Sequence, residues 1–278
     1  MQAGRIDNKT MPNTVTVRRA ARMLGAIVWL SAAGVAGADV GPDDEIYSSR
    51  VEAGEFEVGV RYYDLSGNGQ GAGDGANATH ETRPEIGYSP TGFWRASVSP
   101  VLVNGPRSAT HLHQIQIENV FALPGNGDGL WPDTGVFLSY EIGTIDDAED
   151  ELVLGPVFEK RLAHWLLSAN VFLDRAMVSA PDVGLSYGWQ ARWHPPAGPL
   201  DLGVQGFGEH EFLAEDDEDE NPHAPRYAPG HRAGPALFGE LAMGGDAQLD
   251  YQLGLLFGLD DDAADRTLRL AVEYAFER

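Results

Sequence analysis

The chain lacks cysteine altogether over its 278 residues. Without cysteine there are no disulfides, so another device must hold the fold together. Beyond residue 38 the sequence also lacks any apolar run of about 20 residues, the length that a membrane-spanning helix needs. Two common ways of stabilising an exported or membrane protein are therefore excluded, namely disulfide cross-links and apolar helices.

Basic side chains are also scarce. Lysine occurs only at Lys9 and Lys160, and 19 Lys and Arg residues face 42 Asp and Glu residues, for a formal net charge of −23. Nucleic acid is excluded as a partner, because binding to phosphates needs a basic surface. A strongly acidic surface instead attracts cations. We predict no cofactor.

The first 38 residues have the pattern of an export signal. A basic stretch, Arg18 to Arg22, precedes an apolar run over 23–36, and small residues over 36–38 form a cleavage site. This arrangement predicts a secretory signal peptide over residues 1–38, with Met11 as an alternative start. The paired arginines also suggest twin-arginine export, but the residues around them fit that signal poorly.

Alternation of apolar and polar residues dominates the rest of the chain. Over residues 268–276 every second residue is large and apolar, and Arg, Ala, Glu and Ala stand between them. A period of two indicates a strand with one apolar and one polar face. The pattern predicts twelve strands, at residues 51–64, 80–88, 93–103, 111–122, 134–143, 151–159, 164–175, 183–194, 200–212, 230–241, 249–259 and 268–276.

The links between these strands sort by parity. Longer or more acidic segments follow the odd strands, and mostly tight ones follow the even strands, with the Gly/Pro-rich segment 123–133 as the exception. Short periplasmic turns and longer extracellular loops are typical of bacterial outer-membrane barrels. The sequence thus predicts an all-β fold, a transmembrane antiparallel β-barrel of about 12 strands over residues 47–278, preceded by a short N-terminal segment over 39–46.

A water-soluble fold would alternate too. A β-sandwich or a lipocalin-like barrel in the periplasm also has strands with one apolar face, but it buries that face inside. The two folds differ in where the apolar stripes point. In the membrane barrel they face outer-membrane lipid, and closure pairs every backbone N–H and C=O group in the wall.

Several motifs carry a resemblance to a known group, at residues 83–88, 117–125, 131–135, 154–160, 234–240 and 254–259. With these motifs the chain resembles uncharacterised proteobacterial outer-membrane β-barrel proteins, a group of putative outer-membrane transporters. The resemblance implies an outer-membrane location and recognition of the C-terminal strand by the outer-membrane assembly machinery. It implies no catalytic residues and no particular cargo. Such barrels commonly end on an aromatic residue, whereas Glu277 and Arg278 follow Phe276 here.

The polar strand faces place many charges in the predicted lumen. The candidate lumen-lining residues are Glu55, Glu57, Arg61, Glu81, Arg83, Glu85, Arg95, Glu118, Glu141, Glu159, Arg192, Glu209, Glu240, Arg269 and Glu273. They could line a pore or a polar substrate site, or form an ion-pair network that fills a narrow barrel, because buried charges must be paired. About eight strands leave a filled interior and sixteen to eighteen an open channel, so twelve are consistent with a narrow passage.

Two features suggest metal binding. An acidic run over residues 214–220 includes Asp216, Asp217 and Asp219, whose oxygens suit Ca²⁺ or Mg²⁺. Repulsion between like charges favours a solvated loop there instead. His111 with His113, and His223 with His231, suggest copper or zinc, which would make a metal-resistance barrel a minor alternative.

An enzyme is the least favoured alternative. Ser168, Asn170 and His164 share the predicted inward face of strand 164–175. Their spacings of four and two residues put successive members up to about 13 Å apart along the strand, too far for a catalytic triad. The Gly-x-Ser-x-Gly pattern at residues 184–188 lies inside the predicted strand 183–194 and forms no strand-to-helix elbow, so a hydrolase at the barrel rim is not expected.

The leading hypothesis is a passive channel or transporter for small solutes. Acidic extracellular loops would concentrate cations at its mouth and repel anions. The main alternative is a non-conducting structural or surface-interaction barrel with a plugged polar lumen.

Overall fold

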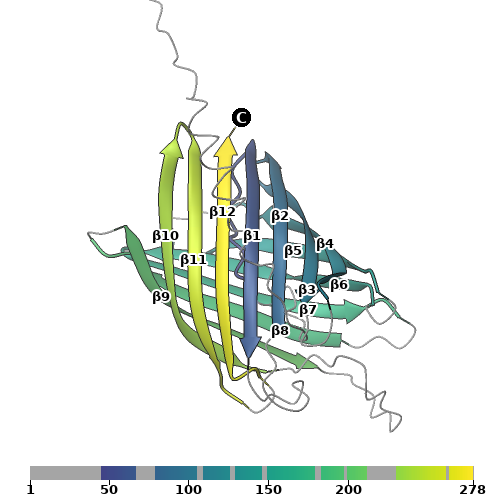
Figure 1. Ribbon diagram of the computed structural model, residues 1–278. Helices are drawn as coiled ribbons and strands as arrows, with labels where there is room; N and C mark the ends of the chain where they lie inside the picture. The colour runs from purple at the N-terminus through teal and green to yellow at the C-terminus, as the bar shows by residue number, and fades with distance from the viewer. Residues whose placement is uncertain are drawn as a thin grey trace, which may run out of the picture.

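The protein is a closed barrel of twelve antiparallel strands (Figure 1). The computed structural model describes residues 45–66, 79–104, 109–125, 129–145, 149–178, 183–196, 199–211, 230–260 and 263–277. The strands are β1 (Glu55–Ser66), β2 (Thr79–Thr91), β3 (Trp94–Asn104), β4 (His111–Ala122), β5 (Asp133–Gly143), β6 (Glu151–Leu162), β7 (Trp165–Ala176), β8 (Val183–Trp193), β9 (Leu200–Glu211), β10 (Arg232–Gly244), β11 (Ala247–Gly258) and β12 (Arg266–Glu277). All twelve predicted strands are present, and the predicted signal peptide lies outside the described residues. No described helix is long and apolar enough to cross a membrane.

The first and last strands close the barrel. β1 pairs with β12 in one uninterrupted register, from Glu55 opposite Glu277 to Ser66 opposite Arg266. β1 also pairs with β2 on its other side, so both of its edges are used. Closure leaves no strand edge in the wall and satisfies the backbone groups, which a chain without disulfides needs for a stable β fold.

The outer wall of the barrel is apolar. Large apolar side chains are exposed on many strand faces that alternate with a buried one, as with Ile86, which is 66% exposed between the buried residues Glu85 and Gly87. Others in this outer belt are Val98, Ile117, Leu154, Val171, Leu173, Leu202, Val204, Leu237, Leu253, Phe257 and Leu268. The apolar stripes therefore point outward, which excludes the water-soluble alternative, because such a continuous apolar surface is stable only against lipid.

Links between strands are short at the end of the barrel where Glu55 and Glu277 lie, which we call the terminal end. Three of them have two residues (92–93, 163–164 and 245–246), whereas every link at the opposite end has at least six. This confirms the predicted parity, and the terminal end is the periplasmic one in barrels of this kind. Segment 123–132 is again the long exception at the terminal end.

One predicted inward residue is misplaced. His164 was expected on the inward face of a strand beginning there, but β7 begins at Trp165 and His164 lies exposed in the turn after β6. The preceding Ala163 has a positive φ of 50°, which reverses the chain within two residues. Alternation alone does not reveal where such a tight turn ends a strand.

A charge on the outer belt should destabilise the barrel. We expect Val171→Arg, on the outward face of β7, to cost about 2–4 kcal/mol of folding free energy in a bilayer, because a guanidinium near the membrane midplane is poorly solvated. Reversible urea unfolding in lipid vesicles measures the cost, with Val171→Ala as the control. Equal stability of the two variants would mean that β7 faces water.

Candidate functional site

Ion pairs join charged residues of β1, β2 and β3 on the inner face of the barrel wall. Arg61 pairs with Glu85 and Arg83 with Glu81, and in each pair both residues are buried. Arg95 Nη1 lies 3.3 Å from Glu57 Oε2. The charges occur as partnered groups, as burial in a barrel interior requires.

The predicted lumen residues all lie on strand faces that point inward, at different depths. Those that are buried are Glu57, Arg61, Glu81, Arg83, Glu85, Glu118, Glu141, Glu159 and Arg269. Those at intermediate exposure are Glu55, Arg95, Arg192, Glu209 and Glu273. Glu240 is exposed, because it lies near the terminal end of β10 where the lumen opens to solvent.

Part of the lumen wall is apolar, which the sequence reasoning missed. Five buried side chains form this apolar wall, namely Val120, Phe137, Val153, Val157 and Phe172. A signal was present, because Phe137 and Phe172 each stand between two outward apolar residues, in Val-Phe-Leu triplets that break the alternation. An uninterrupted apolar run in a strand indicates burial on both faces.

A stretch of the chain before β1 lies inside the barrel. We call Glu45–Arg50 the lumen segment; it spans the boundary predicted at residue 47. Tyr47, 1% exposed, packs on the apolar wall with its ring centroid 4.2 Å from that of Phe137 and 6.0 Å from that of Phe172. Its hydroxyl donates a hydrogen bond of 2.8 Å to Glu118 Oε1. The phenol thus fills a pocket that is apolar at its sides and has a carboxylate at its end.

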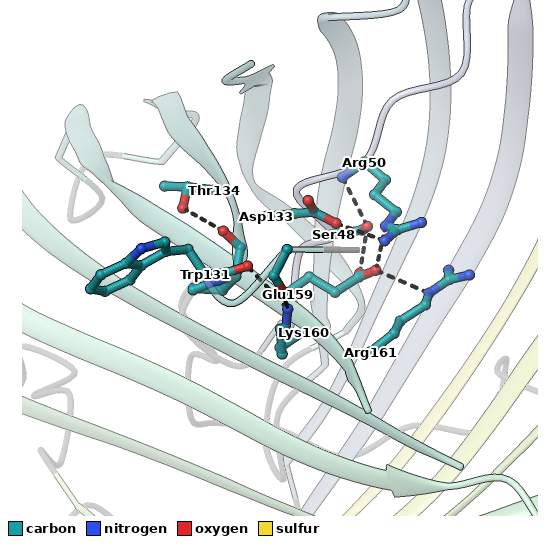
Figure 2. Close-up of polar contacts among 10 residues, drawn as sticks. Ser48, Arg50, Trp131, Asp133, Thr134, Glu159, Lys160 and Arg161 are labelled. Atoms are coloured by element: carbon teal, nitrogen blue, oxygen red, sulfur yellow. Dashed lines mark hydrogen bonds and ion pairs between the residues drawn. The ribbon is translucent and has the colours of Figure 1, made fainter. Parts of the chain in front are cut away.

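A cluster of polar contacts holds Ser48 and Arg50, the C-terminal part of the lumen segment, near the terminal end of the barrel (Figure 2). Ser48 Oγ donates to Glu159 Oε2 at 2.8 Å, and Arg50 Nε lies 3.0 Å from Glu159 Oε1. Arg50 Nη2 donates to Asp133 Oδ2 at 2.7 Å. Glu159, 4% exposed, accepts from Ser48 and pairs with Arg50, and Nε of the exposed Arg161 lies 3.6 Å from Glu159 Oε1. We call these contacts the latch.

Specific contacts also hold the N-terminal part of the lumen segment, Glu45 and Ile46. Asn170 Nδ2 donates to the backbone oxygen of Glu45 at 3.0 Å, and the Glu45 carboxylate pairs with Arg61, which pairs with Glu85 as well. A Cβ added at Gly188 would come within 2.8 Å of Ile46 Cδ1, so glycine leaves room for the segment there. Contacts thus reach β1, β4, β5, β6, β7 and β8.

Side chains make the contacts described above between the lumen segment and the wall. Among the described residues, backbone-to-backbone hydrogen bonding to the wall starts at Gly54, whose N–H donates to Ser89 O at 2.7 Å. The segment is therefore seated on the wall without being part of its hydrogen-bonded ladder. Separating it from the wall would leave the strand pairing of the barrel intact.

Cationic and aromatic side chains meet on another part of the wall. The guanidinium of Arg269 lies 4.4 Å from the ring centroid of Phe207 and 5.5 Å from that of Tyr63, and its Nη1 donates to Gln205 Oε1 at 2.8 Å. These contacts bind the arginine to the wall and restrict its motion.

The other candidate sites find little support. Asp216, Asp217, Asp219 and His223 lie outside the described residues, and within the described part no group of three or more metal-ligating side chains is present. His111 and His113 lie 6.3 Å apart between ring centroids, and His231 Nδ1 contacts the hydroxyl of Tyr187 at 3.0 Å. Ser168 and Asn170 do point inward, but Asn170 is engaged by the lumen segment and His164 lies in a turn.

The fold is shared with channels of the bacterial outer membrane. The chain is similar to the NanC porin, with a TM-score of 0.51 and 11% identity over 80% of this chain and 100% of that one. It is also similar to an outer-membrane channel from Pseudomonas putida F1, with a TM-score of 0.56 and 12% identity over 86% of this chain and 99% of that one. No protein-family model matches the chain, and no curated protein matches its sequence. The closed twelve-stranded wall with its apolar outer belt is that of an outer-membrane β-barrel.

Proposed function

We propose that the protein is an outer-membrane channel for small solutes in which the lumen segment occupies the passage. The proposal rests mainly on one observation, a closed membrane barrel whose inward faces are largely polar and charged. A barrel that serves only as an anchor needs no such interior, since burying charge is costly even when it is paired. The fold shared with the NanC porin and the Pseudomonas channel supports the same class of function.

The lumen should favour cations. Carboxylates facing inward on the described strands outnumber guanidiniums; they include Glu55, Glu57, Glu81, Glu85, Glu118, Glu141, Glu159, Asp174, Asp201, Glu209, Glu240, Asp250 and Glu273, against Arg61, Arg83, Arg95, Arg192, Arg232 and Arg269. Rings of carboxylates lower the energy of a cation in a narrow pore and raise that of an anion. The acidic extracellular loop predicted over 214–220 would add to this preference, and it lies outside the described residues.

A non-conducting barrel is the second candidate, and one observation favours it. Tyr47 is almost fully buried against the apolar wall, as a core side chain is, and so holds the lumen segment in place. If the segment never leaves, the charged network serves stability alone. The two candidates differ in a single measurable property, which is whether ions pass.

Planar-bilayer recording of the purified mature protein tests both. In a tenfold KCl gradient we expect discrete channel openings and a reversal potential of the sign that indicates K⁺ selectivity. We expect a triple substitution of carboxylates toward the terminal end of the barrel (Glu55→Gln, Glu240→Gln and Glu273→Gln) to shift the reversal potential toward zero, because fewer negative charges then line the passage there.

The control is Glu149→Gln, an exposed loop carboxylate at the opposite end, which should leave the reversal potential close to the native value. Absence of any conductance with an intact, heat-modifiable barrel would remove the channel and leave the plugged barrel. Selectivity for Cl⁻ would contradict the assignment of the lumen charges.

A further inference from the structure

The side chains of the lumen segment present a ligand-like pair of groups to the wall. Tyr47 contributes an aromatic ring with a hydrogen-bond donor at its tip, and Arg50 contributes a cation. The ring packs against Phe137 and Phe172, whose own ring centroids are 4.8 Å apart, and the cation lies against Glu159 and Asp133. The chain thus shows which chemical groups this part of the wall accepts.

Most of the charged groups that would lose a contact if the segment left are carboxylates. If the segment moved away, Glu159 would lose both Ser48 and Arg50, and Glu118 would lose the Tyr47 hydroxyl from Oε1. Both carboxylates are less than 5% exposed. The apolar wall would lose the ring that covers it. Such a chamber is apolar in the middle and anionic at both ends, and it would favour a ligand that restores a ring, a donor and a positive charge.

Arg61, which pairs with Glu45 of the lumen segment, does not reverse this preference for a positively charged ligand. Arg61 would lose Glu45 but would keep Glu85, to which it is already paired. A carboxylate ligand would therefore find a cation that has its partner, together with two buried carboxylates that repel it. A positively charged ligand would meet acceptors at both ends of the pocket.

We propose that the chamber formed by the apolar wall, Glu118, Glu159 and Asp133 is a binding site for cationic aromatic compounds passing through the barrel, and that Tyr47 and Arg50 occupy it in their place. The aromatic ring takes the position of the Tyr47 ring, and the amine is directed to Glu159 near the terminal end. The inference rests on the proposed function, in that the lumen segment must leave before a solute enters. It also agrees with the cation preference expected of the lumen.

Isothermal titration calorimetry with the full mature chain in detergent tests the site without requiring conduction. The probe is tyramine, a phenol carrying a protonated ethylamine, followed by 4-hydroxyphenyl-alkylamines with one to four methylenes. We expect a Tyr47→Ala/Arg50→Ala variant to bind the best of these amines at least tenfold more tightly than the native chain, because the competing side chains are gone. In that variant, 4-hydroxyphenylacetate should bind at least tenfold more weakly than the amine.

A simple cavity must be distinguished from a recognition site. With 4-methylphenol, which fills the space of the tyrosine ring without a charge, we expect binding at least tenfold weaker than that of the best amine. Equal affinity for 4-methylphenol, or no binding of any amine to a folded variant, would overturn the proposal. Should the double variant fail to fold, Arg50→Ala alone takes its place, and adding Glu159→Gln to that variant should weaken amine binding about tenfold; an unchanged affinity would contradict the site.

The outcomes separate this inference from the proposed function. A variant that conducts ions but binds no amine would leave the channel standing and remove the site. A variant that binds amines but never conducts would keep the site and remove the channel.

Discussion

Oxidation of a Ser49→Cys/Gly135→Cys variant is expected to abolish the ionic current, and reduction is expected to restore it. A Cβ built at Gly135 lies 3.5 Å from the Cβ of Ser49, which is within the range that a disulfide spans. The chain has no other cysteine, so no competing disulfide forms. The cross-link would fix the lumen segment to β5 and keep the passage occupied. Planar-bilayer recording before and after addition of a reductant measures the effect as a change from no openings to native openings.

The new Cβ at position 135 would also come within 2.9 Å of Val157 Cγ2. Val157→Ala should therefore be present in every protein of this series, to relieve the overlap. The two single-cysteine variants are the controls, and their currents should not respond to oxidant or reductant. Normal currents from a protein shown by mass spectrometry to carry the disulfide would mean that ions pass with the segment in place, and the segment would not be a gate.

Tyr47→Ala should have the opposite effect and increase the time spent open. Removing a buried aromatic side chain costs about 3–5 kcal/mol when its pocket stays empty. The cost falls on the seated state of the lumen segment, because Tyr47 packs against the wall only in that state. A loss of about 3 kcal/mol changes the ratio of released to seated segment by roughly a hundredfold. Single-channel recording should show this as a large rise in open probability.

Tyr47→Phe is the matched control. It keeps the ring against Phe137 and Phe172 but loses the hydrogen bond to the Glu118 carboxylate, a loss of about 1.5 kcal/mol. The ratio of released to seated segment should then rise about tenfold, well below the change expected for Tyr47→Ala. Barrel integrity, followed by heat-modifiable migration on gels, should be the same for both variants, because the strand pairing does not involve position 47. Equal open probabilities for the native chain and Tyr47→Ala would contradict the role of this residue.

Local patterns in the sequence were enough to predict the wall. Alternation is a property of neighbouring residues, and it places Leu268 outward and Arg269 inward whatever the rest of the chain does. The same reasoning brought Arg61 and Glu85 to one face of adjacent strands, although not into one ion pair. Phe137 and Phe172 were overlooked because inward positions were assumed to be polar throughout.

The sequence by itself determined the strands, the outward apolar belt and the inward charges, because each follows from a period of two within about ten residues. Only the tertiary structure decided what fills the barrel. Residues 45–50 have no periodicity, and the partners of that segment are remote: Tyr47 meets Glu118 71 positions away, and Glu45 meets Asn170 125 positions away. Those partners come together only when β1 closes on β12, so no local pattern could reveal where the lumen segment binds inside the barrel.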